Sequence, residues 1–303
     1  MLIFFKYLPY WKDLDVRHSI DVMHVEKNVC DSIIGLLLDI PGKTKDGIKS
    51  RKDLVHFEIR PELHPEDRPN GKHYLPPASY SLTPEEKKAL CKCLRGVRVP
   101  TDYSSNIKNL VSMKDLKLIG MKSHDCHVMM TQMLPIAIRG IKPRYIKVVI
   151  TRLCHFFNAI AQKVIDAEKL GALHSSLVEI LCQLEMCFPP SFFDIMVHLL
   201  VHIVNEIIAL GPVFLHQMYA LERYMGILKG YVRNRAHPEG SMIEGYSTEE
   251  VVECCIDYIK DSNPIGVPVS RHEGRLSGRG TKGKKRFIDH DYKAVEEAHF
   301  TIL

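Results

Sequence analysis

Between residues 123 and 209 the sequence carries four long stretches with apolar residues at helical spacing, separated by glycine or proline. A period of 3.6 residues predicts amphipathic helices, and Gly or Pro ends each of them. No series of alternating apolar and polar residues is long enough for a sheet. The chain is therefore expected to be mainly α-helical, with helices over about Ser123–Arg139, Arg144–Lys169, Ser175–Phe188 and Ser191–Ala209.

Further helices are expected on both sides of this region. Residues 21–38 place Val, Ile and Leu at helical spacing. The segment Thr83-Pro-Glu-Glu86 is a capping box with proline at the first helical position, which predicts a helix ending near Leu94. Two later patterns predict helices over about Val213–Val232 and Thr248–Lys260.

Composition divides the chain into four parts. Residues 1–41 end with the first expected helix, and residues 42–82 are rich in charge, Pro, Gly and His, which predicts an irregular linker. Residues 83–262 hold the other helices. Residues 263–303 begin with a run of Gly, Arg, Lys and Ser. Because this last part offers little apolar surface to bury, it is expected to be a largely flexible tail.

The formal net charge of +5 comes from one segment, residues 271–293, which holds eight basic and three acidic residues. The rest of the chain has 33 of each. A compact basic run can neutralise DNA phosphates or direct nuclear import. The alternative is a solvated tail with neither role. The residues expected to contact DNA here are Arg279, Lys282, Lys284, Lys285 and Arg286.

Features of secreted and membrane proteins are missing from the sequence. The apolar start lacks the charge and cleavage pattern of a secretory signal. The most apolar stretch, residues 192–210, carries too many polar groups for a membrane span. Nine scattered cysteines are interpreted as reduced thiols. We therefore expect a protein that is not secreted, with no membrane partner, in the nucleus or otherwise the cytoplasm.

Several local strings resemble plant CACTA (En/Spm-type) DNA transposases, in particular the C-terminal part of those proteins with the domain of unknown function that follows the transposase core. The similar strings reach nearly from end to end of the chain. They are LPYW at 8–11, RHSIDVMHVEKNVC at 17–30, KSHDCH at 122–127, LERYMG at 221–226, YVRNRAHPEGS at 231–241 and RHEGRLSG at 271–278.

The resemblance implies a ribonuclease-H-like core whose catalytic acids bind Mg²⁺ or Mn²⁺, with a helical insertion before the final acid. Residues 1–41 would then be a remnant of that core, and residues 83–262 an irregular helical domain attached to its end. An Asp-x-x-His element of the family matches Asp21 and His24, and the final glutamate matches Glu222, which would also be the metal ligand. The other two acids would lie upstream of Met1. The implied partner is transposon-end DNA, bound by a protein that can form homo-oligomers.

Side-chain spacing gives these matches a chemical interpretation and an alternative. On a helix Glu222, Lys229 and Arg233 form one stripe that can bind metal and phosphate, or else a solvated face with a weak charge pair. Asp21 and His24 can share a ligand, or Asp21 can simply cap a helix. Phosphodiester cleavage needs two cations held by several carboxylates. A lone glutamate does not supply them, so the chain is expected to be inactive by itself.

Three groups contain zinc-type ligands without completing a zinc signature. They are the segment His124-Asp125-Cys126-His127, the pair Cys91 and Cys93, and the pair His198 and His202. None shows four ligands or a paired Cys-x-x-Cys, so structural zinc is not expected. The histidine pair lies in a strongly apolar pattern, which favours hydrogen-bonded core histidines.

Two classes of function remain from the sequence. The first is a catalytically incomplete C-terminal fragment of a cut-and-paste transposase. The second is a non-catalytic helical module derived from a transposon that binds DNA or protein. The sequence has no glycine-rich phosphate loop and no G-x-S-x-G elbow, so neither a metabolic enzyme nor a small-molecule substrate is expected.

Overall fold

The computed structural model describes residues 7–14, 16–69, 71, 73–99 and 105–257. These residues are mainly helical, as the sequence predicts, and they form two compact units that divide between Ala220 and Leu221. The expected basic tail at 263–303, with its candidate DNA contacts, lies outside the described residues. No single helix among the described residues is long and apolar enough to cross a membrane.

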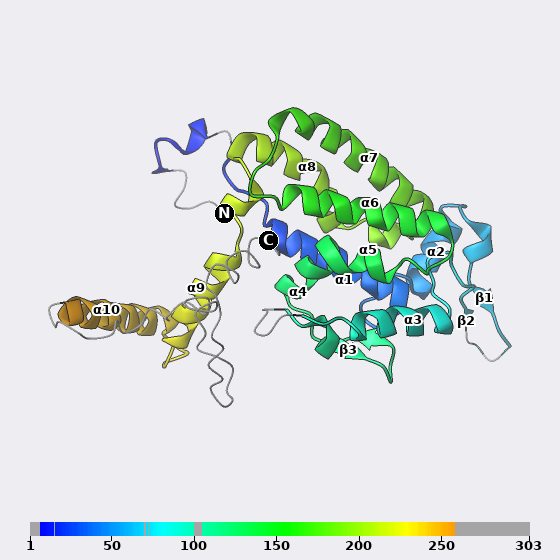
Figure 1. Cartoon of the computed structure of the whole chain (residues 1–303), viewed down its shortest axis with the longest axis horizontal. Coiled ribbons are helices and arrows are strands. Elements are labelled where there is room, and N and C mark those ends of the chain that lie inside the picture. The colour runs from blue at the N-terminus through cyan, green and yellow to red at the C-terminus, as the bar shows by residue number, and fades with distance from the viewer. Residues whose placement is uncertain (1–6, 15, 70, 72, 100–104, 258–303) are drawn as a thin grey trace, which may run out of the picture. The chain divides into compact units, whose positions relative to one another are not determined.

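Helix α1 (Val22–Leu38) is the central element of the first unit. Asp21 caps its start, and one face of valine, isoleucine and leucine is buried. In Figure 1 it runs beneath α6 and beside α4, and its residues pack against both α4 and α8. Gly35 is required on α1 because a Cβ there would lie 2.6 Å from the Lys43 carbonyl oxygen. Helix α1 is therefore packed inside the helical unit.

The segment expected as an irregular linker contains regular structure. Helix α2 (Ile48–His56) is followed by the hairpin of β1 (Glu66–Asp67) and β2 (His73–Tyr74). Arg51 of α2 is 1% exposed, and its Nη2 donates to Asp46 Oδ2 at 2.7 Å. Tyr80 donates to the same carboxylate. This buried charged cluster, which local composition does not reveal, joins distant parts of the segment to each other. Contacts of Lys45 with Asp194 and of Arg60 with the Phe188 carbonyl hold the segment on the helical body.

Helix α3 (Pro84–Arg95) begins with the predicted capping box, in which both reciprocal hydrogen bonds are formed. A hairpin of β3 (Val111–Ser112) and β4 (Lys117–Leu118) follows. The expected helix at 123–139 is divided into α4 (Ser123–Val128), a π-helical turn over Met129–Met133 and α5 (Leu134–Ala137). Pro135 lies just after the π-helical turn, at the start of α5, where its missing N–H is tolerated.

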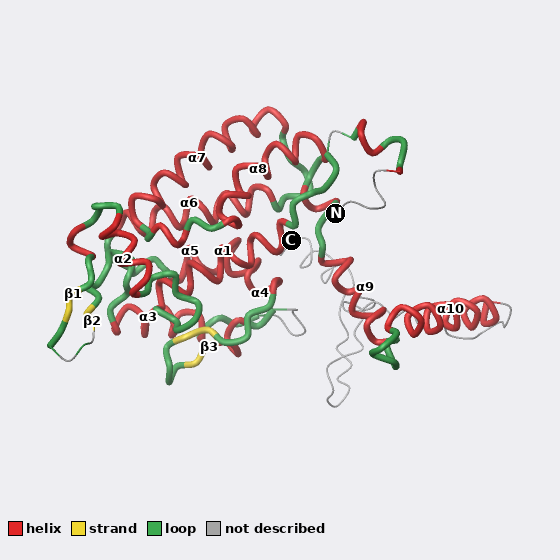
Figure 2. The backbone as a smooth tube through the Cα atoms, turned by 180° about the vertical axis from the view of Figure 1, so that it is seen from behind, coloured by secondary structure: helices red, strands yellow, loops and turns green. Residues whose placement is uncertain are grey.

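Three long helices complete the first unit: α6 (Arg144–Ile160), α7 (Leu170–Cys187) and α8 (Ile195–Leu210). Figure 1 and the rear view in Figure 2 both place α6 beside α7 and α5, in agreement with their contacts. Phe156, Phe157, Phe188 and Phe192 are buried between these helices. The apolar patterns in the sequence are thus core-forming faces, and the helix bounds shift by several residues at the loops.

The second unit contains most of α9 (Tyr219–Gly230) and all of α10 (Pro238–Asp257). Within it, the Tyr231 ring covers Gly245, where an added Cβ would collide with the ring at 2.7 Å. The Tyr231 hydroxyl donates to Glu249. Helix α10 begins at Pro238, well before the expected start at Thr248, because proline is favourable at a first helical position.

Candidate functional site

The two longest motif strings of the first unit meet where α1 packs on α4. Glu26 of α1 is 6% exposed, and one of its carboxylate oxygens lies 2.9 Å from Nδ1 of His127 on α4. Cys30 and Cys126 are buried beside this pair, and their side chains interact. We call Glu26, His127, Cys30 and Cys126, with His124 at the start of α4, the α1–α4 polar centre.

The two histidines of the polar centre have pKa values shifted in opposite directions. The hydrogen bond to the Glu26 carboxylate raises the pKa of His127, against the opposing effect of burial. Burial lowers the pKa of His124, and the nearby His127 lowers it further. The arrangement therefore favours an imidazolium at His127 and a neutral ring at His124.

Two buried thiols at the centre, those of Cys30 and Cys154, are held in the protonated form. The hydrogen bond to Cys126, followed by burial, raises the pKa of Cys30 well above its ordinary value. Burial and the nearby Glu26 charge raise the pKa of Cys154 to about 12. Because the thiolate is the reactive and metal-binding form, these side chains act as packing groups and not as nucleophiles.

A cavity of about 10 Å³ borders Glu26, His127, Gln217 and Tyr219. Among the described residues no hydrogen-bond partner reaches Oε1 of Glu26, which is buried. A volume of about 10–15 Å³ is enough for one water molecule. The polar centre can thus hold a charged pair and one water, and it has no space for a small-molecule substrate.

Asp21 and His24 lie at the start of α1, in the same unit. Oδ1 of Asp21 accepts a hydrogen bond from the backbone N–H of His24 at 3.1 Å, and the His24 ring is exposed. The contact between these residues is therefore a helix cap made with the backbone. It is the capping alternative of the sequence analysis, and the carboxylate does not orient the imidazole.

The predicted stripe on α9 is shorter than expected. Glu222 and Lys229 are exposed on this helix, in the second unit. Helix α9 ends at Gly230, so Arg233 lies in the loop that follows and does not continue the stripe. The expected placement of Arg233 at helical spacing is wrong because the chain turns at Gly230 toward α10.

Zinc-type ligands are dispersed in the structure. The Asp125 carboxylate accepts hydrogen bonds from the backbone N–H of Lys122 and the hydroxyl of Ser105, at 2.9 and 2.6 Å. Cys91 is buried while Cys93 is exposed. Within the part of the chain that the structure describes, no three His, Cys, Asp or Glu side chains gather in a way that could hold a metal ion.

His198 and His202 were expected in the core, and this expectation is wrong. Both rings are exposed, with their Nε2 atoms 3.2 Å apart. The buried face of α8 is supplied by Val197, Leu200, Ile203, Val204 and Ile207. The histidines fall on the opposite side of the helix, and their spacing relative to these apolar residues already indicates this.

Glu26 is the functional candidate that our sequence analysis missed. It lies four residues after Val22 and three before Val29, both of which are buried. A carboxylate at that register of an apolar stripe is expected to be buried with a partner. The signal was therefore present in the sequence, although the identity of the partner was not.

Comparison with known families gives one match. A family model described as a domain of unknown function, DUF4218, matches residues 160–271. This range starts at the last residue of α6 and includes α7, α8, α9 and α10. No curated protein and no solved structure matches the chain. The family description carries no activity.

Proposed function

We propose that the chain is the C-terminal part of a plant CACTA (En/Spm-type) DNA transposase and that it does not cleave DNA by itself. The observation that carries the proposal is the contact between the two strings of the resemblance at 17–30 and 122–127. They lie 101 residues apart at Glu26 and His127, yet they form one buried ion pair. The two motifs therefore form one packed centre of the fold, which supports the proposal that both come from the same protein family.

In this proposal the polar centre positions the helix that carries the Asp-x-x-His element. The Glu26–His127 pair joins α1 to α4, and Ile20 is held from the other side by two hydrogen bonds to the Glu206 carboxylate on α8. The segment that leads into α1 is thereby fixed by contacts with α8, and α1 itself is fixed by its contact with α4. A ribonuclease-H-like core joined to this segment would be anchored on the helical unit.

The described residues do not fit a two-metal site. Such a site needs two cations about 3.5–4 Å apart, held by carboxylates from separate elements. The Asp21 carboxylate caps α1, and Glu222 is exposed on α9. In the complete transposase the metal ions, Mg²⁺ or Mn²⁺, are bound with acids of the upstream core, and Glu222 is the acid that this chain contributes. The substrate is transposon-end DNA, in the nucleus.

A second candidate is a non-catalytic helical module of transposon origin that binds DNA or protein. Exposed apolar side chains on α9 and α10 favour it. Leu221, Met225 and Ile243 are 56%, 58% and 68% exposed. No residue of α9 is buried. Apolar helix faces of this kind are typical of surfaces that pair with another protein or a second copy.

A cleavage assay separates these proposals. The purified chain, mixed with terminal-repeat DNA and Mg²⁺ or Mn²⁺, is expected to give no product. The same chain joined to the open reading frame upstream of it is expected to cleave. Glu222→Gln should abolish that cleavage, while Glu244→Gln, an exposed glutamate on α10, should leave it intact.

Two results contradict the proposal. Metal-dependent cleavage by the chain alone, lost on Glu222→Gln, refutes the claim that it is inactive by itself. An upstream frame without two suitable acids, or a joined protein whose cleavage is unchanged by Glu222→Gln, refutes the transposase assignment and favours the interaction module.

A further inference from the structure

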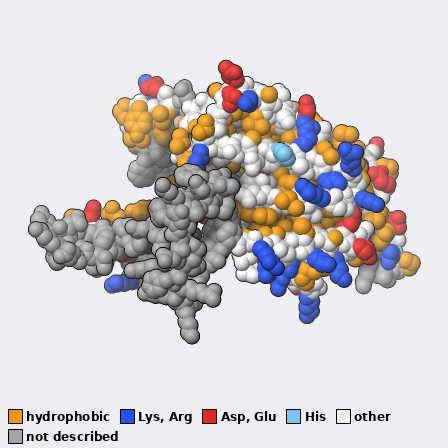
Figure 3. All heavy atoms as spheres, in the orientation of Figure 1, with side chains coloured by type: hydrophobic (Ala, Val, Ile, Leu, Met, Phe, Trp, Pro, Cys, Tyr) orange, Lys and Arg blue, Asp and Glu red, His pale blue; other side chains and the backbone are white. Residues whose placement is uncertain are grey.

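A long hollow on the first unit combines an apolar floor with a basic rim. Its volume is about 920 Å³, and it is bordered by α5, the turn after it, α6 and α7. The rim carries Arg139, Arg144, Lys147 and Arg152, and none of the described residues that line it is acidic. Figure 3 shows Lys and Arg side chains lying among hydrophobic ones on this face of the first unit.

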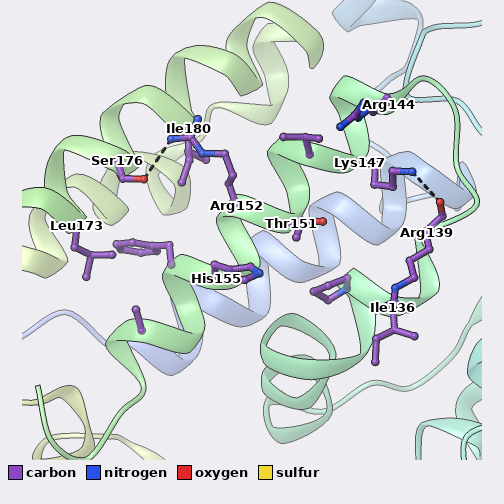
Figure 4. A pocket seen from close by; sticks show the side chains of 14 residues that line it. Ile136, Arg139, Arg144, Lys147, Thr151, Arg152, His155, Leu173, Ser176 and Ile180 are labelled. Carbon is purple, nitrogen blue, oxygen red and sulfur yellow. Dashed lines mark hydrogen bonds between the residues drawn. The ribbon is translucent and has the colours of Figure 1, made fainter.

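The cations follow one face of α6. Arg144, Lys147, Arg152 and His155 lie at i, i+3, i+8 and i+11, which spans about 17 Å at a rise of about 1.5 Å per residue. In Figure 4 Arg139, Arg144 and Lys147 lie toward one end, and Arg152 points to Ser176 of α7 at the other. Positive charge is therefore distributed along a line.

Three cations of the rim, Arg139, Arg144 and Lys147, form no ion pair with an acidic side chain among the described residues. Lys147 donates only to the Arg139 carbonyl oxygen, at 2.8 Å, and among the described residues no ion pair involves Arg139 or Arg144. Arg152 differs, because it pairs with Glu179 at 2.8 Å. About three positive charges thus line a groove that is apolar inside, and the complementary ligand is a polyanion.

The hollow continues into a second one along α6. This neighbour, of about 850 Å³, shares Arg144 and Val148 with the first and reaches Met186 of α7. Tyr145 lines it and is 51% exposed, and the His155 ring is exposed in the first hollow. Two linked hollows suit an extended chain better than a compact molecule.

We propose that this track over α5, α6 and α7 binds single-stranded nucleic acid. The phosphates lie along Arg139, Arg144 and Lys147, and unpaired bases pack on the apolar floor and against the Tyr145 and His155 rings. Grooves that combine cations with exposed rings bind single strands in this way. A duplex keeps its bases stacked inside and offers no flat apolar face to the floor. The inference does not depend on the transposase proposal, since it rests on the groove alone.

The charge arm of the test uses labelled oligo-dT and fluorescence anisotropy with the full chain. Arg139→Glu/Arg144→Glu is expected to weaken binding about tenfold or more, because each lost phosphate contact is charge-assisted. The control Lys49→Glu/Lys52→Glu makes the same charge change at exposed residues of α2 and should stay within about twofold. Circular dichroism checks that both variants are folded.

Salt dependence supplies an independent readout. The three phosphate contacts of the groove should contribute about −2 to the slope of log K against log salt, and losing two of them should reduce the size of the slope by about 1.4. The control variant should keep the slope of the unmodified chain. Equal affinities and slopes for the two double variants would overturn the proposal.

The strand arm separates single strands from other polyanions. Tyr145→Ala should lower oligo-dT affinity about tenfold, within the range of one base stacked on a ring. Phe57→Ala, which removes another exposed ring, should not change it. Duplex DNA that binds as tightly as oligo-dT and is insensitive to Tyr145→Ala would overturn the proposal. So would displacement of oligo-dT by polyglutamate at equal charge, which would indicate an acidic peptide partner.

Discussion

Removing the His127 side chain tests the α1–α4 polar centre directly. In His127→Ala, Glu26 stays buried and loses the ion pair of its Oε2, while its Oε1 already has no partner among the described residues. Breaking a buried pair by removing one partner costs about 3–5 kcal/mol. Since the His127 side chain is 25% exposed, we expect the lower end, about 3 kcal/mol.

The size of this effect makes it measurable by urea or thermal unfolding followed by circular dichroism. For a unit of this size, a loss of about 3 kcal/mol lowers the midpoint by about 6–12 °C. The control His202→Ala changes an exposed ring and should stay within about 0.5 kcal/mol. In the double variant Glu26→Met/His127→Leu no charge is buried, so stability should return to within about 1 kcal/mol of the unmodified chain.

Two results would refute this reasoning. The first is a His127→Ala variant that loses no more stability than His202→Ala. The second is a double variant less stable than His127→Ala alone. In either case the pair would not be a buried charge interaction that joins the two helices.

Three further predictions concern stability. The pKa of His127 is raised in the folded chain. The contribution of His127 to the free energy of unfolding is therefore complete below its unfolded pKa of about 6.5 and is lost as pH rises through its folded pKa. The urea midpoint should fall with rising pH in that window, and His127→Ala should remove this fall. Gly35→Ala forces a Cβ against the Lys43 backbone and should lower the free energy of unfolding by about 1–3 kcal/mol. Gly171→Ala, whose Cβ meets open space on α7, should raise it by about 0.5–1 kcal/mol, and thermal unfolding compares the two variants. Thr83→Ala removes the cap of α3 and should cost about 1 kcal/mol by the same measurement, while Thr83→Ser should cost much less.

The candidate site was only partly accessible from sequence. The cap at Asp21 follows from a local rule, because the hydrogen bond closes within three residues. The buried position of Glu26 could have been inferred from its place among the valines of α1. Its partner could not, since His127 is 101 residues away and several other histidines are equally plausible from sequence. The groove on α6 was also missed, because its border combines residues from α5, the turn after it, α6 and α7.

Local chemistry in the sequence determined where several helices begin and that the chain is mainly helical. The capping box at Thr83 and the apolar period of α1 specify hydrogen bonds and faces within a few residues, so no distant contact is needed to predict them. Only the tertiary structure decided which buried charges meet. Tyr80 reaches the Asp46 carboxylate across 34 residues, whereas Arg51 and Asp46 are only five residues apart. Glu26 meets His127 because of how α1 packs on α4, since burial requires a partner but does not name it.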